Sequence, residues 1–379
     1  MVKISAFSAI RPIKKLVSKV TTQAYSSYSK KEIGLEIKNN PYSYLNIIGN
    51  HQTQKKDKRF HLIRKKIHQF QDKNILKKDT TKKLYIYQQI HKKNRYLGLI
   101  CAVDLKEYGQ GKIKIHEHTI LERELLFAQY LEITKIHAEP VLITYDSNEN
   151  YIQQESMQEK NKLYDFKTKD GVKHIIWEIK NQKEINRIKG NFNEINNLYI
   201  ADGHHRMASS FRCQKNGKCL AYIIPKNELD IKPFHRAIKI TKPLLTRLRD
   251  KVNLKKQNEP NPLSKKIQCY IKGQWYEVQA PPSSIHQLLI NHLLNHILKP
   301  IFKIHDERTD KNVRYISGDN TIDNLINNLT ETEILFFLNT IKIKTIINLA
   351  NNNQTTPAKS TFILPKLPSG LIIMDLLSC

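Results

Sequence analysis

Apolar residues recur at helical spacing in the N-terminal third of the chain. Within residues 57–73, Phe60, Ile63, Ile67 and Phe70 stand three or four positions apart, with basic residues between them. This spacing predicts an amphipathic helix with a cationic outer face. A solvated charged face is the simplest interpretation of the basic residues, and a helix that contacts DNA is the alternative.

Stretches rich in β-branched and aromatic residues predict strands. Residues 83–90 alternate in polarity, residues 96–105 form a more apolar run, and the polar connection between them suits a hairpin. Asp170-Gly171 predicts a second hairpin within residues 164–179, and a third is expected around Lys272-Gly273. Further strands are predicted at 139–146, 198–201, 219–225 and 333–338, and further helices at 121–136, 184–192, 284–298 and 320–329.

Strands and helices are mixed along the chain without a regular strand–helix–strand repeat. This order favours an α+β fold, with a mixed sheet and flanking helices, over a doubly wound parallel sheet. Residues 245–266 are polar and contain prolines, as linkers do, so a boundary is expected there. We therefore expect a core over residues 1–244 and a smaller α+β part over residues 245–379, packed on the core as one unit.

The chain is strongly basic. Its 379 residues include 63 Lys and Arg against 35 Asp and Glu, which gives a formal net charge of +28. Such a charge attracts nucleic acid, anionic membrane surfaces or phosphorylated metabolites. However, lysine far outnumbers arginine, asparagine and isoleucine are abundant, and base-specific nucleic-acid sites depend more on arginine. We interpret most of the charge as compositional drift.

The cysteines and the N-terminal residues indicate the cellular compartment of the protein. Five scattered cysteines lack the paired spacing of a zinc or redox site, which favours a reduced cytoplasmic protein. Residues 1–30 are basic, rich in serine and free of acids, as in a mitochondrial transit peptide; the alternative is that they belong to the fold. No apolar run approaches the ~18 residues that span a bilayer, so no membrane partner is expected.

The densest group of reactive side chains is Asp-Gly-His-His-Arg at residues 202–206. The apolar run 198–201 precedes it, and apolar residues at helical spacing follow within 207–211. Gly203 permits the sharp turn that a join between strand and helix requires. The first N–H groups of that helix lack intrahelical partners and create an anion site, which the helix dipole and Arg206 strengthen.

Each remaining residue of this stretch suits phosphate chemistry. Asp202 beside a phosphate could hold a divalent metal or accept a proton. His204 and His205 could donate to phosphate oxygens or shuttle protons near neutral pH. A capped helix whose histidines satisfy neighbouring carbonyls is the alternative, but five such residues at one join favour a functional site.

The sequence "LYIADGHHRMASS" resembles the signature of the uncharacterised bacterial family catalogued as domain of unknown function 1015 (DUF1015). The resemblance runs through the whole chain. The other segments that carry it are "FSAIRP" (7–12), "NPYSYLNII" (40–48), "YDFKTKDGVKHIIW" (164–177), "LDIKPFHRAIK" (229–239), "DERTDKNVRYISG" (306–318) and "PAKSTFILPKLPSG" (357–370).

The element formed by a strand, D-G-H-x-R and a helix is also similar to the ParB/sulfiredoxin-like superfamily. That superfamily includes partition proteins that bind CTP, sulfiredoxin, and kinases of free serine. The resemblance implies a nucleotide-binding core in which Asp202, His204 and Arg206 stand near the phosphates, with Glu117 as an upstream acid that acts as base. It also implies a nucleotide (ADP or ATP) and Mg²⁺ at Asp202 as cofactors.

Three places depart from the family pattern. Residues 24–27 (Ala-Tyr-Ser-Ser) lack the acid of a Pro-Tyr-Asp-Val segment. Leu126, Phe127 and Tyr130 stand where the family has an Asp-Arg pair followed by a histidine, and Leu364 stands where a glutamate is expected. Either the substrate differs, or the site is partly decayed.

Two further groups of polar residues are candidates for phosphate or substrate contacts. Arg236 and the pair Asp306/Arg308 form the first group, for which a structural salt bridge is the alternative. Lys359, with the hydroxyls of Ser360 and Thr361, forms the second. No glycine-rich loop surrounds the second group.

Three functions remain open. The first is a phosphate- or nucleotide-binding protein that acts as a phosphotransferase on a small hydroxylated metabolite such as free serine. The second is a nucleotide-gated, ParB-like DNA-binding protein; the expected helix-turn-helix after the motif is not apparent, because residues 240–283 resemble a linker and a hairpin. The third is a catalytically decayed member of the family that still binds phosphate.

Overall fold

The computed structural model describes residues 2–49, 56–152, 154–279, 288–357 and 359–378. Contacts divide the chain into two compact units, each of which is described by itself. Unit 1 comprises residues 1–229 together with 365–379, and unit 2 comprises residues 230–364. Helices and mixed or antiparallel sheets make up the chain, so the fold is α+β as predicted.

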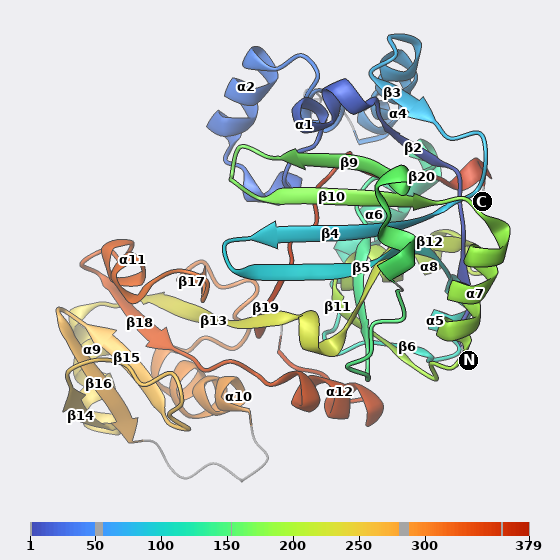
Figure 1. Cartoon of the computed structure of the whole chain (residues 1–379). Helices are drawn as coiled ribbons and strands as arrows, with labels where there is room; N and C mark the ends of the chain where they lie inside the picture. Colours follow the sequence, from blue (N-terminus) through green and yellow to red (C-terminus); the bar gives the residue numbers. More distant parts are fainter. Residues whose placement is uncertain (1, 50–55, 153, 280–287, 358, 379) are drawn as a thin grey trace. The chain divides into compact units, whose positions relative to one another are not determined.

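Unit 1 is built on a nine-stranded mixed sheet (Figure 1). In spatial order its strands are β6 (Ile113–Lys114), β11 (Leu198–Asp202), β8 (Val141–Tyr145), β12 (Lys218–Pro225), β5 (Asn94–Asp104), β4 (Leu84–His91), β10 (Lys173–Ile179) and β9 (Lys162–Lys167), with β1 (Ile4–Ser5) paired to β5. The pairs β6–β11 and β8–β12 are parallel, and the other pairs are antiparallel. β8 and β12 are buried along almost their whole length, as their continuous apolar sequences require.

Two predicted hairpins of unit 1 are confirmed. β4 and β5 are antiparallel, with His91 opposite Asn94 across a two-residue turn. β9 and β10 are also antiparallel, and Gly171 in their turn has a φ of +80°. A positive φ of this size is easily adopted only by glycine, which explains the Asp-Gly signal in the sequence.

Helices flank the strands of unit 1. They are α1 (Val17–Val20), α2 (Lys30–Asn39), α3 (Leu45–Ile48), α4 (Lys56–Asp72), α5 (Leu105–Gly109), α6 (Leu121–Thr134), α7 (Gln182–Asn193) and α8 (His204–Cys213), with short 3₁₀ turns η1 (Lys14–Leu16), η2 (Tyr25–Ser27), η3 (Gln154–Met157), η4 (Glu159–Asn161), η5 (Lys226–Glu228) and η7 (Leu376–Ser378). The amphipathic helix predicted over residues 57–73 is α4. Its apolar stripe, from Phe60 to Phe70, packs into a buried cluster with Tyr44 and Ile373.

A small antiparallel sheet joins the two ends of unit 1. Its strands, in spatial order, are β3 (Leu76–Lys78), β2 (Ala9–Pro12), β20 (Ile373–Asp375) and β7 (Ile136–His137). Ala9 lies opposite Met374, so the C-terminal residues complete a sheet that the N-terminal residues begin. In β2, the buried Arg11 forms an ion pair with Asp79 at 2.7 Å. The basic, serine-rich start of the chain therefore contributes strands to the fold.

Unit 2 contains a seven-stranded antiparallel sheet with helices. Its strands are β14 (Asn253–Gln257), β16 (Gln274–Gln279), β15 (Ile267–Ile271), β18 (Glu333–Phe337), β13 (Asp230–Lys239) and β17 (Val313–Ser317), with β19 (Thr361–Leu364) paired to β13. Its helices are α9 (Lys242–Lys251), α10 (Leu289–Leu293), the π-helix η6 (Leu294–Phe302), α11 (Ile322–Asn327) and α12 (Ile343–Asn351). The hairpin predicted around Lys272-Gly273 is formed by β15 and β16.

The polar stretch 245–266, which we expected to resemble a linker, contains most of α9 and the strand β14. β14 lies at the edge of its sheet and is largely exposed, so its residues can be polar without breaking the strand. Part of the helix predicted over 284–298 lies outside the described residues. The division into units falls at 229/230 and 364/365; the domain boundary at 244/245 stays a prediction.

Candidate functional site

The strand, turn and helix predicted around residues 198–213 are present in unit 1. β11 ends at Asp202, Gly203 follows with a φ of +99°, and α8 begins at His204. The apolar residues of β11 are buried in the sheet, and Met207 anchors the first turn of α8 in the core. The local sequence thus fixes where the strand ends and which way the helix leaves it.

Gly203 is required for two reasons. Its left-handed backbone is unfavourable for a residue with a side chain. A Cβ atom at this position would also lie 3.0 Å from Nε of Arg206, so the guanidinium packs directly over the glycine. Gly203 makes no side-chain cap for α8, and the start of a helix is a place where an anion is favoured.

Asp202 is held between two cations at the start of α8. Its Oδ2 atom lies 3.4 Å from Nζ of Lys366 and 3.8 Å from a terminal nitrogen of Arg206. Burial around Asp202 favours the neutral acid, but the charges of Lys366 and Arg206 outweigh this effect, so the pKa of Asp202 lies below its usual value. The carboxylate is therefore ionised at neutral pH while its side chain remains 43% exposed.

Lys366 joins this group from the C-terminal segment, although its sequence signal is weak. Its backbone carbonyl accepts a hydrogen bond from Nε2 of Gln89 at 3.3 Å, which fixes the segment against β4. Its side chain is 41% exposed, so the ammonium is accessible to a ligand. In the sequence, Lys366 stands within residues 357–370, one of the segments that resemble the family.

The two histidines of the motif bind the segment that carries Glu117. Nε2 of the buried His204 accepts the backbone N–H of His116 at 3.4 Å, and Nε2 of His205 accepts the backbone N–H of Ile120 at 2.9 Å. An Nε2 atom that accepts a hydrogen bond carries no proton, so the neutral ring is protonated at Nδ1. Burial, the first cause, together with the nearby His116 holds the pKa of His204 well below its usual value.

Glu117 lies on this segment and is partly buried. β6 and β11 run parallel, with Ile113 opposite Leu198, so the chain leaves both strands at the same edge of the sheet. Glu117 and Asp202 follow at that edge. The roles of Glu117, His204 and His205 in proton transfer stay predictions.

The structure adds a second acid, Glu139, which the sequence did not single out. Its Oε2 atom lies 3.5 Å from Arg206, whose guanidinium also donates to the carbonyl of Pro140 at 2.5 Å. Ser369 donates a hydrogen bond to the other carboxylate oxygen of Glu139. Arg206 therefore lies between two carboxylates, one at the end of β11 and one just before β8.

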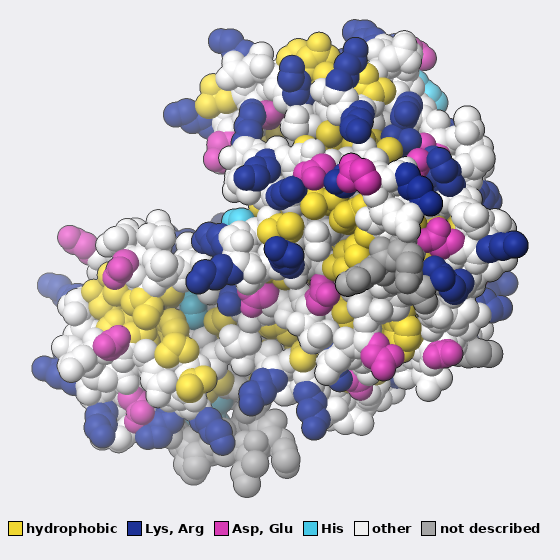
Figure 2. Space-filling model, viewed as in Figure 1, with side chains coloured by type: hydrophobic (Ala, Val, Ile, Leu, Met, Phe, Trp, Pro, Cys, Tyr) yellow, Lys and Arg dark blue, Asp and Glu magenta, His cyan; other side chains and the backbone are white. Residues whose placement is uncertain are grey.

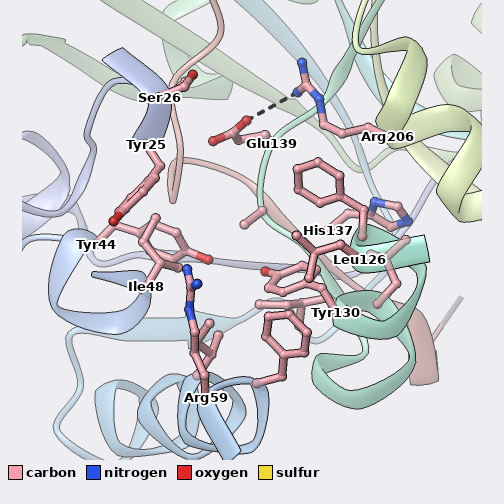
Figure 3. Close-up of a pocket in the computed structure, with 17 residues that line it drawn as sticks. Tyr25, Ser26, Tyr44, Ile48, Arg59, Leu126, Tyr130, His137, Glu139 and Arg206 are labelled. Atoms are coloured by element: carbon pink, nitrogen blue, oxygen red, sulfur yellow. Dashed lines mark ion pairs between the residues drawn. The ribbon is translucent and has the colours of Figure 1, made fainter. Parts of the chain in front are cut away.

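A cavity of about 320 Å³ opens beside Arg206 and Glu139 (Figure 3). Its walls are mostly apolar and come from η2, α3, α4, α6 and the segment after β7. Two of the three departures from the family pattern lie at this cavity. The departing residues that line it are Ala24, Tyr25, Ser26, Leu126, Phe127 and Tyr130, and Ser27 is next to Ser26 in the chain. Two of the three departures are thus gathered in one place next to the motif, whereas Leu364 belongs to unit 2.

The remaining sequence candidates lie in unit 2. Arg236 is completely buried and forms an ion pair with Glu307 at 2.5 Å. Arg236 also donates to the carbonyl of Lys359 at 3.0 Å, and Ser360 donates to the carbonyl of Pro357 at 2.6 Å.

Other members of this group pair locally. Thr361 begins β19 opposite Pro233, and Leu364 lies opposite Asp230 at the other end of that strand. Asp306 and Arg308 form an exposed ion pair at 2.7 Å. Their roles in binding phosphate stay predictions.

Neither a metal cluster nor a membrane-spanning helix is found in the described part of the chain. Among the described residues, no group of three or more His, Cys, Asp or Glu side chains is arranged to hold a metal ion. In the same part of the chain, no helix combines the length and apolarity needed to cross a bilayer. The described cysteines are unpaired, and burial raises the pKa of Cys219 to about 11, so its thiol is protonated at neutral pH.

Comparison with known proteins places the chain in a family. Among solved structures, it is similar to a variant of free serine kinase in complex with ADP (12% identity, 73% of this chain and 91% of that chain, TM-score 0.42). It is also similar to SbnI with a C-terminal truncation from Staphylococcus aureus (12% identity, 70% and 82%, TM-score 0.39) and to a conserved hypothetical protein from Pyrococcus furiosus (12% identity, 73% and 97%, TM-score 0.39). No curated protein matches the chain. The model of the family described as protein of unknown function (DUF1015) matches residues 4–326, and the chain belongs to that family.

Proposed function

We propose that this protein binds the phosphates of a nucleotide, ADP or ATP, at the turn between β11 and α8 and transfers a phosphoryl group to a small hydroxylated metabolite. One observation carries the proposal. An ionised carboxylate, Asp202, stands between Lys366 and Arg206 at the uncapped start of a ten-residue helix. Phosphoryl transfer depends mainly on positioning and charge neutralisation, and these groups supply both.

The cations of this turn suit phosphate oxygens. The guanidinium of Arg206 offers several N–H donors in one plane, and the exposed ammonium of Lys366 adds a mobile charge. The N–H groups at the start of α8 and the helix dipole add further attraction for an anion. An arriving phosphate would compete with Asp202 for Lys366, whose contact is long at 3.4 Å and therefore weak.

Asp202 is also the residue that suits Mg²⁺. Magnesium in nucleotide sites is usually bound by one or two carboxylates together with the phosphates of the substrate. Asp202 is ionised and partly exposed, so it fits that pattern without a second protein carboxylate. When bound, Mg²⁺ would neutralise charge on the transferred phosphoryl group.

A second carboxylate must accept the proton of the acceptor hydroxyl. In the reaction, the hydroxyl oxygen forms a bond to the terminal phosphorus, and the bond from that phosphorus to the bridging oxygen of the nucleotide breaks. The proton leaves to the carboxylate, and the nucleotide departs one phosphate shorter. Glu139 supports this role because it lies beside Arg206 and lines the cavity; Glu117 is supported by the resemblance and by the segment that His204 and His205 bind.

Free serine is the acceptor that the resemblance to the ParB/sulfiredoxin-like superfamily favours. The test uses purified full-length protein with Mg²⁺, ADP or ATP, and serine. We expect a phosphorylated acceptor from the wild type. In Asp202→Asn we expect the rate to fall by about a hundredfold or more, the loss that follows when one charge-stabilising group is removed. Asp72→Asn, which changes an exposed acid at the end of α4, is the matched control. Undiminished turnover in Asp202→Asn would contradict the role of this acid.

Two other functions give different results. A decayed protein would bind the nucleotide and be stabilised by it, with no product. A nucleotide-gated DNA-binding protein would bind DNA with a steep dependence on salt.

Figure 2 shows Lys and Arg spread over the visible face, with Asp and Glu between them. Within described residues 240–279 the chain forms one helix and three strands, which is not a helix-turn-helix.

A further inference from the structure

The cavity beside Arg206 contains buried polar atoms without partners. Oη of Tyr25 and Nε of Arg59 are each enclosed, and neither makes a side-chain hydrogen bond to the described residues. Oη of Tyr44 is enclosed as well, with the hydroxyl of Tyr130 beside it. A buried donor without a partner is unfavourable, because it has lost its hydrogen bonds to water. Such atoms indicate a ligand or water that is bound in the working protein.

All three of these atoms are hydrogen-bond donors. Burial is the main reason that the pKa of Tyr44 lies well above its usual value, so its hydroxyl keeps its proton. The guanidinium of Arg59 offers only hydrogen-bond donors and no acceptor. Figure 3 shows Tyr25, Tyr44 and Arg59 on the same side of the cavity. Two hydroxyls and a guanidinium together form a site for an anionic group that accepts hydrogen bonds. A carboxylate has the matching geometry.

The middle of the cavity is apolar. Its walls come mainly from one face of α4 and one face of α6, with aliphatic and aromatic side chains from Ile48, Phe60, Ile63, Leu126, Phe127, Leu131 and Ile136. A free serine molecule would leave these walls uncovered, because its side chain is a single polar CH₂OH group. A ring or a branched chain would cover them. A cavity of roughly 150 Å³ holds a benzene molecule, so about 320 Å³ accommodates a ring with substituents at both ends.

The other side of the cavity reaches the proposed phosphoryl-transfer site. Arg206 and Glu139, which are linked by an ion pair, lie across the cavity from Arg59 (Figure 3). A ligand with its carboxylate at Arg59 would therefore present its far end to Arg206 and Glu139. A hydroxyl at that end would be next to a carboxylate that could take its proton.

We infer that the acceptor is a small carboxylic acid with an apolar, ring-sized body and a hydroxyl at the end opposite the carboxylate. The inference rests on the proposed function in assigning the hydroxyl as the group that reacts. The binding of the carboxylic acid in the cavity does not depend on the proposed function. Tyr25, Tyr44 and Arg59 bind the carboxylate, α4 and α6 enclose the body, and the hydroxyl lies at Arg206 and Glu139.

The ligand test uses titration calorimetry on the full-length protein with three probes. Para-hydroxyphenylacetate has all three parts of the inferred ligand, para-cresol lacks the carboxylate, and L-serine lacks the apolar body. We expect para-hydroxyphenylacetate to bind about tenfold more tightly than either, since a charge-assisted hydrogen bond and a covered apolar wall each contribute that much. Equal affinity for para-cresol, or tighter binding of serine, would overturn the inference.

Variants locate the bound acid. Arg59→Gln removes the cation at the carboxylate-binding side of the cavity, and Lys65→Gln removes a cation from an exposed position of the same helix. Ser26→Trp fills the cavity from η2, and Ser27→Trp is its exposed neighbour, which does not line the cavity. We expect about tenfold weaker binding of para-hydroxyphenylacetate in Arg59→Gln and Ser26→Trp and wild-type binding in both controls. Wild-type affinity in both cavity variants would overturn the inference.

The same titrations with ADP separate this inference from the proposed function. If the wild-type protein binds ADP but does not bind para-hydroxyphenylacetate, only the inferred class of acceptor is overturned. Binding of para-hydroxyphenylacetate without any binding of ADP overturns the proposed function and leaves the acid site in place.

Discussion

Nζ of Lys366 lies 3.4 Å from Oδ2 of Asp202, although 164 residues separate them in the chain. The C-terminal segment thus completes a site that begins at the end of β11. Because both side chains are partly exposed, this pair adds little to stability, and we interpret Lys366 as a ligand-binding residue rather than a structural one.

Lys366→Gln should weaken ADP binding about threefold to tenfold, because one exposed, charge-assisted contact to a phosphate is lost. The free energy of unfolding should stay within about 0.5 kcal/mol of the wild type. Titration calorimetry and urea unfolding measure the two quantities. Lys77→Gln, an exposed lysine of β3, is the control; equal ADP affinities in the two variants would remove Lys366 from the site.

Gly203→Ala should lower stability and weaken nucleotide binding. The residue has a φ of +99°, and an added Cβ would lie 3.0 Å from Arg206, so the backbone is strained and the guanidinium is displaced. Gly171→Ala is a close match, because its φ is +80° and nothing lies within 4 Å of the added Cβ. Both variants should lose about 1–2 kcal/mol of stability, but only Gly203→Ala should weaken ADP binding, by about tenfold or more. Equal ADP binding in both would contradict the placement of Arg206 over the glycine.

Glu139→Gln and Glu117→Gln distinguish the two candidates for the base. Removal of the base should lower the rate of phosphoryl transfer by about 10²–10⁴ with little change in ADP affinity. The position of Glu139 beside Arg206 and in the cavity predicts the larger loss for Glu139→Gln. Initial rates at saturating nucleotide measure the effect. A larger loss in Glu117→Gln would favour the acid that the resemblance indicated.

Stability should fall as the pH is lowered from about 6.5, because buried histidines must stay neutral in the folded protein. Burial, followed by the charge of Arg206, lowers the pKa of His137 to about 3. The unfolded chain, with an ordinary histidine pKa, takes up the proton first, so the stability present above pH ~6.5 is lost progressively down to pH ~3. His116, His174 and His235 behave alike, since burial lowers each pKa to about 4.

Urea unfolding between pH 7.5 and pH 5 measures this dependence. His137→Gln should reduce the slope of stability against pH, while His61→Gln, on the exposed side of α4, should not. A slope that is the same in the wild type and in His137→Gln would show that His137 takes up its proton in the folded state at its ordinary pKa.

The local parts of the site could be predicted from the sequence. The apolar run 198–201, the glycine and the helical spacing after it are determined by neighbours in the chain, so the strand, the turn and the helix were predicted in place. The same is true of the hairpins, where Gly171 and Gly273 mark the turns, and of the helix α4.

The parts of the site that depend on contacts between distant segments could not be predicted from the sequence. Glu139 stands just before the ordinary apolar strand β8, and nothing near it in the sequence indicates that Arg206 lies 3.5 Å away. Lys366 lies near Asp202 in a segment whose backbone is bound by Gln89 and which continues into β20, paired with β2. The polarity of residues 245–266 suggested a linker, because an exposed edge strand and a linker have the same composition.

The histidines illustrate the same limit. Adjacent histidines at a strand–helix join suggested proton transfer or contacts to phosphate. Only the folded structure brings the backbone N–H groups of His116 and Ile120 to His204 and His205. The sequence contained the reactive groups, but not the partners that define what they bind.

The central claim is that the turn between β11 and α8 binds the phosphates of a nucleotide. Calorimetric titration of ADP, in the presence of Mg²⁺, into the wild type and Arg206→Gln tests it most directly, with Arg187→Gln on the exposed face of α7 as control. The account predicts saturable binding to the wild type and the control, and binding weakened about tenfold or more in Arg206→Gln. Absence of ADP binding to the wild type, or equal affinity in all three proteins, would contradict it.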